Sequence, residues 1–409
     1  MSRSVLLKME SRNGKAARER SQRQPELDAL RGLLLIGMTL THLPTHASLY
    51  AYQPFGFVAA AEGFILVSAM LTGRIYGRTL PSDGIRVVAR RLWERAAKLY
   101  SYHLLLLLVA FTVVAFLAVK QQQPALQGLL DFYLAHRGLA VVSSALLIYC
   151  PPLLDILPMY IVFLLLTPAA LFIGRRWGWR YVLAPAALLW VAAQFGLREM
   201  IYTHLVQWTG FAVPLQNMGA FNLYAWQFLW AVGLWLGTGA SERVAERFTS
   251  RASVIAALVV AVAFFIMRYQ LIPYLAAHPV DQGESGLFLF DKWHLGIARV
   301  LNFTALGILF ASARSYVSRW MAIEPLVVLG QSSLEVFSVH LLFCFAALAW
   351  IGDGIGSPFR DQASVIVVTF TGLYALAHYR LERKRQAKAR VTEVRLVKPT
   401  EIDFARRAA

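Results

Sequence analysis

The chain has 409 residues, of which 58% are hydrophobic and only 15% are charged, and its mean hydropathy is +0.53. Soluble domains carry roughly 45–50% apolar and about 25% charged residues, so this composition excludes an ordinary soluble protein. A formal net charge of +17 could indicate nucleic-acid binding, but the basic residues gather in segments between apolar runs. We therefore expect no nucleic-acid partner.

Apolar runs of helical length recur along the chain, and each can cross a hydrocarbon core of roughly 30 Å as an α-helix. Lipid admits only helices and closed barrels, and these runs are too long for barrel strands. The sequence therefore predicts an all-α, polytopic membrane protein with ten transmembrane helices. The expected spans are 27–48, 56–73, 98–119, 158–174, 181–197, 222–238, 252–271, 297–313, 325–350 and 363–379.

The positions of Lys and Arg predict the orientation. With the N-terminus inside, the cytoplasmic segments hold 33 of the 40 Lys and Arg residues, as the positive-inside rule requires. We expect two basic cytoplasmic tails, 1–25 and 380–409, around a ten-helix membrane domain at 26–379. The basic loop 74–98 would also be cytoplasmic, and these basic segments could alternatively serve only to anchor the protein to anionic lipid. The stretch 121–157 is expected to be interfacial or re-entrant on the outer face.

Three ionisable residues lie on one face of the first span, where lipid makes such groups costly. Asp28 and Arg31 are three residues apart, and His42 follows Arg31 by eleven residues. At roughly 100° per residue, eleven residues bring a side chain back to within about 20° of its starting direction. At about 1.5 Å per residue, His42 would lie roughly 16 Å further out than Arg31.

Further polar residues fall at the depth of His42 in other spans. Glu62 and His42 each lie on the order of 9 Å inside the expected outer boundary. Gln227, Arg299 and His340 also fall in the outer third of their helices. Convergence of five helices on one layer favours a buried site, although His42 and His340 could be ordinary helix-to-helix contacts, and Glu62 and Arg299 a purely structural pair.

A metal site is not expected. His42 and His46 have the i, i+4 spacing of two ligands on a helix, but Pro44 lies between them and no third ligand is evident.

Several blocks of sequence resemble a known family. The segment Glu26 to Gly32 reads ELDALRG, and His42 stands eleven residues after its arginine. Further blocks follow in order: Phe55 to Phe57, Ala61 to Phe64 with Ser68, Lys98 to Tyr100 with His103, Leu157 to Tyr160, Ala225 to Gln227, Arg299 to Asn302, Leu329 with Gly330, and Ser333 to Phe337. The set resembles the acyltransferase-3 superfamily, and more narrowly its OpgC branch, which succinylates osmoregulated periplasmic glucans.

The resemblance implies an acyl-CoA-dependent O-succinyltransferase. The donor would be cytoplasmic succinyl-CoA, with no permanently bound cofactor, and the acceptor a hydroxyl of a periplasmic glucan. The protein would be a multi-pass protein of the inner membrane of a Gram-negative bacterium. Within the same class, an O-acetyltransferase of a periplasmic or cell-surface glycan remains open.

The family resemblance and the positions of the polar residues together predict a role for each site residue. His42 would be the general base, since histidine titrates near neutral pH, or alternatively an acyl carrier, and Glu62 would orient it. Arg299 would bind the succinyl carboxylate and Gln227 the oxyanion, with His340 and Trp226 as further substrate-binding candidates. The candidates for binding acyl-CoA, where guanidinium groups suit phosphate, are Asp28, Arg31, Arg90, Arg91, Arg95 and His103.

A secondary transporter or flippase is the alternative from another class, because intramembrane charges can also form a proton relay. Against it, the sequence shows no paired Gly- or Pro-broken helices in matching halves. Thiol release from acyl-CoA would distinguish the two.

Overall fold

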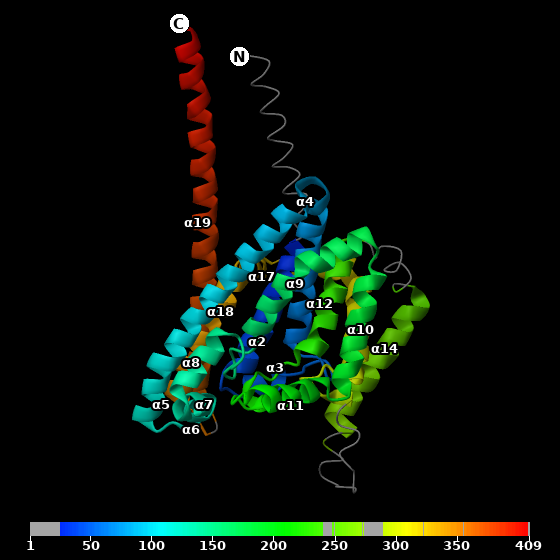
Figure 1. The fold of residues 1–409 in the computed structure, drawn as a ribbon, viewed down its shortest axis with the longest axis vertical. Helices are drawn as coiled ribbons and strands as arrows, with labels where there is room; N and C mark the ends of the chain where they lie inside the picture. The colour runs from blue at the N-terminus through cyan, green and yellow to red at the C-terminus, as the bar shows by residue number, and fades with distance from the viewer. Residues whose placement is uncertain are drawn as a thin grey trace.

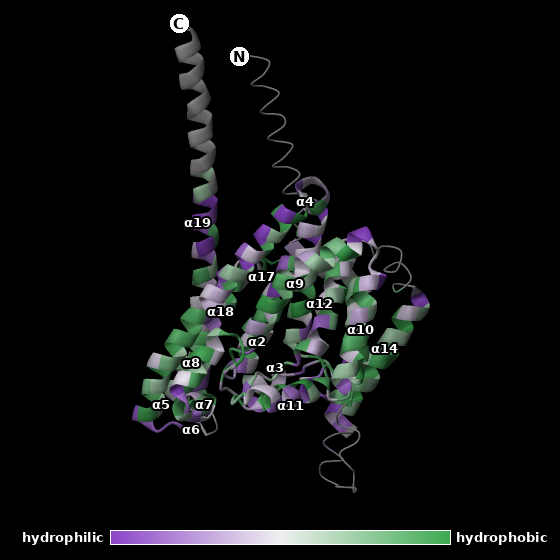
Figure 2. Ribbon diagram, viewed as in Figure 1, coloured by the Kyte–Doolittle hydropathy of each residue, from purple (hydrophilic) through white to green (hydrophobic). Residues whose placement is uncertain are grey.

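A computed structural model describes residues 25–239, 248, 250–271, 273, 289–321, 323–354 and 356–407. Within these ranges the chain forms helices and turns and no strand, which confirms the all-α prediction. Figure 1 shows the helices gathered side by side in one bundle, with α19 projecting beyond it. Figure 2 shows hydrophobic residues along the middle of the bundle and hydrophilic ones mainly at its ends.

The first described helix, α2 (Pro25–His42), is shorter than the span expected at 27–48. It ends at His42 because Pro44 has no backbone N–H and disfavours the helical conformation of the residue before it. A short helix, α3 (Ala47–Ala51), follows the break. His42 consequently lies at the last turn of α2 rather than six residues inside a longer helix.

The next helical segment, Ala60–Gln121, is 62 residues long and contains two of the expected spans. It comprises α4 (Ala60–Val109), a π-helical stretch η1 (Ala110–Val114) and α5 (Ala115–Gln121). A straight helix of this length would reach roughly 90 Å, three times the hydrocarbon thickness. The chain instead turns at Gly84, whose φ of 77° suits glycine. Residues 74–98 are therefore two helical arms around one turn, not the loop that we expected.

Three short helices occupy the stretch expected to be interfacial. They are α6 (Pro124–Leu129), α7 (Asp131–Ala135) and α8 (Arg137–Ala145), and Figure 1 places them at the end of the bundle opposite the turn of α4. The long helix α9 (Ile156–Arg176) follows and runs back along the bundle.

The middle of the chain adds α10 (Arg180–Gln194) and α11 (Leu197–Thr209), which are bent by 76° to one another. After the short η2 (Leu215–Asn217) come α12 (Leu223–Gly237), α14 (Arg251–Ile266) and the π-helical η3 (Met267–Leu271). The bend lets α11 lie across the same end of the bundle as α6 to α8 (Figure 1).

The last helices are α16 (Ile297–Met321), α17 (Glu324–Gln331), α18 (Ser333–Ile351) and α19 (Phe359–Arg407). The span expected at 325–350 is broken at Ser332, so it comprises two helices. The two serines at the break, Ser332 and Ser333, can hydrogen-bond nearby backbone groups and so compete with the helix.

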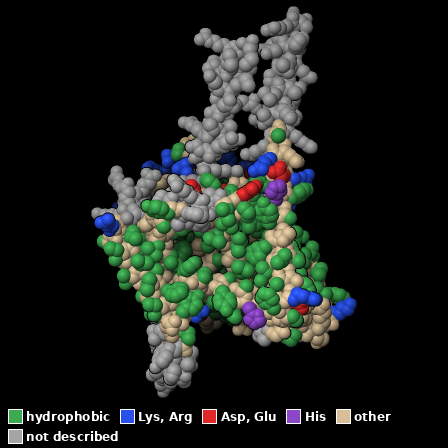
Figure 3. All heavy atoms as spheres, turned by 180° about the vertical axis from the view of Figure 1, so that it is seen from behind, with side chains coloured by type: hydrophobic (Ala, Val, Ile, Leu, Met, Phe, Trp, Pro, Cys, Tyr) green, Lys and Arg blue, Asp and Glu red, His purple; other side chains and the backbone are tan. Residues whose placement is uncertain are grey.

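Five helices among the described residues are long and apolar enough to cross a membrane, or six if the bent pair α10 and α11 counts as one span. Figure 3 shows hydrophobic side chains covering the middle of one face, with charged groups near its upper and lower ends. These features identify a membrane protein. Ten crossings and cytoplasmic termini stay predictions.

Glycines bring α2 and α17 into backbone contact. A Cβ atom added to Gly32 would lie 2.1 Å from the carbonyl oxygen of Leu326, and one added to Gly330 would lie 1.8 Å from that of Asp28. Only glycine permits this approach. The contact places the first turn of α18 beside Arg31, which donates a hydrogen bond to the hydroxyl of Ser333.

Candidate active site

Two histidines from different helices are in direct contact. Nδ1 of His42, at the end of α2, lies 3.1 Å from Nε2 of His340 in α18, and their rings are stacked. Nδ1 of His340 lies in hydrogen-bonding contact with the backbone carbonyl of Phe337. A carbonyl oxygen only accepts, so His340 carries its proton on Nδ1 and accepts with Nε2. His42 must then donate from Nδ1, which leaves its Nε2 as a free acceptor.

His42 lines a cavity between α2, the start of α4 and the start of α9, which we call the histidine cavity. Its polar wall residues are Thr41, His42, Asp155 and Lys292, and its apolar wall includes Ile156. Asp155 accepts a hydrogen bond at 3.1 Å from the N–H of Ala220, and burial raises its pKa to about 6. A basic nitrogen, a carboxyl group and an ammonium group therefore face one enclosed space.

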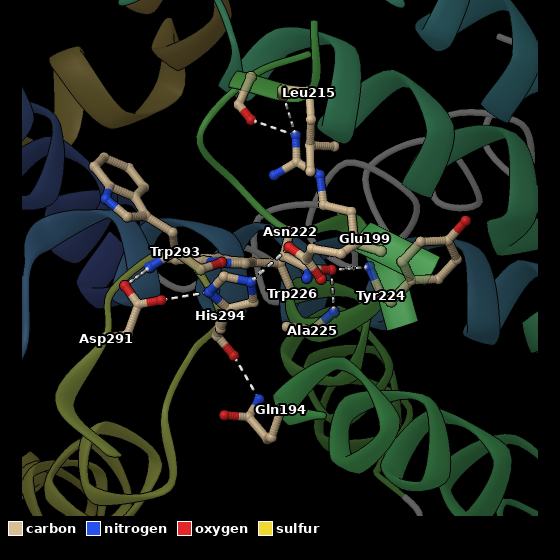
Figure 4. Close-up of polar contacts among 12 residues, drawn as sticks. Gln194, Glu199, Leu215, Asn222, Tyr224, Ala225, Trp226, Asp291, Trp293 and His294 are labelled. Carbon is tan, nitrogen blue, oxygen red and sulfur yellow. Dashed lines mark hydrogen bonds and ion pairs between the residues drawn. The ribbon is translucent and has the colours of Figure 1, made fainter. Parts of the chain in front are cut away.

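The loop that carries Lys292 is anchored by the two residues that follow it, Trp293 and His294. Figure 4 shows His294 bonded to Asp291 on one side and to Gln194 on the other. The carbonyl oxygen of Trp293 accepts from the indole N–H of Trp226 at 3.1 Å, and that of His294 accepts from Gln194 at 2.7 Å. Bonds from α12 and α10 thus hold the loop directly after Lys292.

An aspartate and a glutamate hold the His294 ring itself. Asp291 hydrogen-bonds its Nδ1, and Glu199 lies 3.5 Å from its Nε2. The hydrogen bond to Asp291 is the main cause that raises the pKa of His294 above its usual value.

Glu62 and Arg299 form a buried ion pair between α4 and α16. Nε of Arg299 donates to Oε1 of Glu62 at 3.1 Å, and its Nη2 contacts the same oxygen. The other carboxylate oxygen accepts from the N–H of Ala59 at 3.1 Å. The two side chains are 0% and 1% exposed, so each charge depends on the other. Glu62 is bonded here rather than to His42.

Arg31 and Arg95 line a second cavity, which we call the arginine cavity, together with Tyr160 and Ser333. Arg95 donates to the Tyr160 hydroxyl at 3.2 Å. Ile156 lies in the walls of both cavities, so the histidine and arginine cavities are neighbours along the start of α9.

The other residues proposed to bind acyl-CoA lie elsewhere in the described structure. Arg90 pairs with Glu94 on the exposed surface of the second arm of α4, and Arg91 pairs with Asp83, which stands just before the turn at Gly84. His103 is fully buried, with Nε2 3.4 Å from the carbonyl oxygen of Ser144.

Three further candidates pack the helices that surround the site. Asp28 lies in the first turn of α2, where its carbonyl oxygen faces Gly330. Gln227 donates to the carbonyl oxygen of Ala186 at 2.7 Å and so links α12 to α10. Trp226 is fully buried and supports the Lys292 loop.

The family model for the OpgC protein matches residues 23–385. The chain belongs to the OpgC family. Searches of curated proteins and of solved structures found no match. OpgC membership makes the chain a membrane acyltransferase that acts on glucans, and it confirms the resemblance seen in the sequence.

Two residues of this OpgC protein's histidine cavity escaped the sequence reasoning. Lys292 is one of seven Lys and Arg residues that the expected topology puts near the outer side, and that rarity was the available signal. Asp155 stands directly before α9, after Pro151 and Pro152, and its sequence gives no sign that it faces His42. Among the described residues no group of His, Cys, Asp and Glu could hold a metal ion.

Proposed function

We propose that the protein transfers a succinyl group from cytoplasmic succinyl-CoA to a hydroxyl of a periplasmic glucan, in the inner membrane of a Gram-negative bacterium, with His42 as general base. The observation that carries the proposal is the hydrogen-bond chain from the Phe337 carbonyl through His340 to His42. It leaves a basic nitrogen of His42 available at the cavity, as proton abstraction from a sugar hydroxyl requires.

The donor would enter from the side of the arginine cavity. Arg31 and Arg95 supply two guanidinium groups there, and guanidinium forks suit phosphate. Lys98 and Lys384 flank the same region, because both pair with Glu335 in the first turn of α18, at 3.0 Å and 3.9 Å. We assign the CoA phosphates to these four cations in place of Arg90 and Arg91.

The pantetheine arm would then pass Ile156 to bring the thioester to the histidine cavity. Arg31 and His42 are eleven residues apart on α2, which corresponds to roughly 16 Å along the helix. This separation lets one end of the donor stay at the arginine cavity while the acyl group reaches His42.

In the transfer itself, His42 alone carries the proton from the sugar hydroxyl to the leaving group. Nε2 of His42 accepts the hydroxyl proton of the sugar as its oxygen attacks the thioester carbonyl carbon. The new C–O bond forms, the C–S bond breaks, and CoA leaves as a thiolate that takes the proton back from His42. Asp155 can accept hydrogen bonds from other hydroxyls of the sugar, because it lines the same cavity.

Purified protein in detergent, given succinyl-CoA and a glucan, tests the proposal. We expect free thiol to appear only with both substrates present, and the glucan to gain the mass of a succinyl group. Acetyl-CoA as the preferred donor would make the protein an O-acetyltransferase, and no thiol release from any acyl-CoA would favour a transporter or flippase.

A further inference from the structure

We propose that Lys292 binds the distal carboxylate of the acyl group and so selects a dicarboxylic acyl donor over acetyl-CoA. The inference rests on the proposed function and adds a specificity-determining residue to it. Lys292 was not among the residues that the sequence singled out, and Arg299 was expected in this role.

The first support is that the Lys292 ammonium makes no close ion pair with any carboxylate among the described residues. Its Nζ lies over the rings of Tyr52 and Trp293, 4.8 Å and 4.7 Å from their centroids. In the described part of the chain no carboxylate oxygen lies within ion-pair distance of it. Aromatic faces attract a cation but do not neutralise it, so the site can accept an anion.

The second support is the setting of this ammonium. Burial lowers the pKa of Lys292, while the charges of Glu62 and Asp155 oppose that shift. A partly buried ammonium that no carboxylate contacts directly is costly, and a bound carboxylate would reduce that cost. Most other residues of the cavity wall are apolar, including Met38 and Phe221, so a neutral acetyl group would need no cation there.

The third support is that Arg299 is unsuited to this role. Its guanidinium is 1% exposed and already bound to Glu62, and the pair lines neither described cavity. Lys292 lines the same cavity as His42. The carboxylate of a succinyl group stands two methylene groups beyond the carbonyl that is attacked, so the two ends of one acyl group could contact His42 and Lys292 in that cavity.

The test compares the ratio of kcat/KM for succinyl-CoA to that for acetyl-CoA, because the fraction of folded protein cancels in this ratio. We expect Lys292→Met to lower the ratio roughly 10- to 100-fold, the range for losing a hydrogen bond between charged groups. Lys292→Arg should retain most of the preference. Lys120→Met is the matched control, since Lys120 also lies over an aromatic ring, that of Phe116, but is exposed.

The outcomes separate this inference from the proposed function. An unchanged ratio in Lys292→Met, in an otherwise succinyl-selective enzyme, would overturn the role of Lys292 and leave the acyltransferase intact. An equal loss of kcat/KM with succinyl-CoA and with acetyl-CoA would also overturn the role of Lys292. It would assign Lys292 to folding or to a step that both donors share. A wild-type protein that releases no thiol from either donor would instead refute the proposed function.

Discussion

His42 is the residue on which the proposed chemistry depends. Replacing it with Ala should lower the rate of acyl transfer by about 10²- to 10⁴-fold, the contribution of a general base. Acyl-CoA affinity should stay close to that of the wild type, because the arginine cavity is untouched. Single-turnover transfer and binding of acyl-CoA, each measured on purified protein, check both expectations.

His340 provides the graded comparison for that experiment. His340→Ala removes the acceptor that orients His42 but not the base, so a smaller fall of about 10- to 100-fold with measurable remaining activity is expected. His46→Ala is the control, since this histidine bonds Gln362 and does not line the cavity. If His42→Ala kept more than a few per cent of the rate while Glu62→Gln was inactive, Glu62 would be the base.

The Glu62 and Arg299 pair predicts a stability effect. Removing one partner leaves a buried charge uncompensated, which typically costs about 3–5 kcal/mol. Glu62→Gln and Arg299→Met should therefore each lower the Tm in detergent. The double variant should recover part of the loss. If the double variant lost the sum of the two single effects, the charges would not depend on one another.

Among the polar residues, the sequence predicted only some of the pairs that meet in the structure. His42 with His340, and Glu62 with Arg299, do meet, as shared depth suggested. Yet Glu62 does not bond His42, because the rotation and tilt of each helix decide which side chains face one another. Lys292 was missed because it lies in a loop, where no periodicity shows which way a side chain points.

Among the elements, the contact between α2 and α17 is the most sensitive to a single methyl group. Gly330→Ala would force its Cβ against the carbonyl oxygen of Asp28 and move α17 away from Arg31. Overpacking of this kind costs about 1–3 kcal/mol. We expect a lower Tm and weaker acyl-CoA binding. Gly307→Ala in α16 is the control, because nothing lies within 4 Å of its added Cβ, and equal effects of both changes would contradict the argument.

The loop that carries Lys292 predicts a dependence on pH. Asp291 raises the pKa of His294, so the folded state holds this proton more tightly than the unfolded state does. The stabilisation is complete below the unfolded pKa of about 6.5 and is lost as pH rises through the higher folded value.

Thermal unfolding from about pH 6 to about pH 9 measures this effect. The Tm of the wild type should fall more over this range than that of His294→Gln. His204→Gln, an exposed histidine of α11, should behave as the wild type does. Parallel curves for wild type and His294→Gln would show that the Asp291 contact does not stabilise the loop.

The existence of the helices was largely predictable from apolar runs in the sequence, whereas the positions of their breaks were not. The turn at Gly84 lies in a basic segment that reads as a loop, yet that segment forms helix on both sides, because Arg and Lys are good helix formers. The break at Ser332 lies in the short polar stretch Gln331 to Ser333, which the expected span at 325–350 treated as part of one helix.

On the scale of the whole molecule, the two cavities lie toward opposite ends of α2. The arginine cavity lies near the ends of α2 and α18 that meet at Arg31 and Ser333, and the histidine cavity lies at the other end of α2. Under the proposed function, a cytoplasmic acyl donor and an acceptor outside the membrane can therefore meet in this protein only if the arginine end faces the cytoplasm. The orientation of the bundle thus decides whether the mechanism is possible.

Cysteine labelling in intact cells tests that orientation. Ser82 lies in the turn of α4 and Gln121 at the end of α5, and both are exposed. Figure 1 shows the turn of α4 and helix α5 at opposite ends of the bundle. In a background without Cys150 and Cys344, a membrane-impermeant thiol reagent added outside should label Gln121→Cys and leave Ser82→Cys unlabelled until the membrane is opened. Because basic residues crowd the segment around Ser82, the positive-inside rule places it in the cytoplasm. Labelling of Ser82→Cys from outside would invert the bundle and put the arginine cavity beyond the reach of cytoplasmic acyl-CoA.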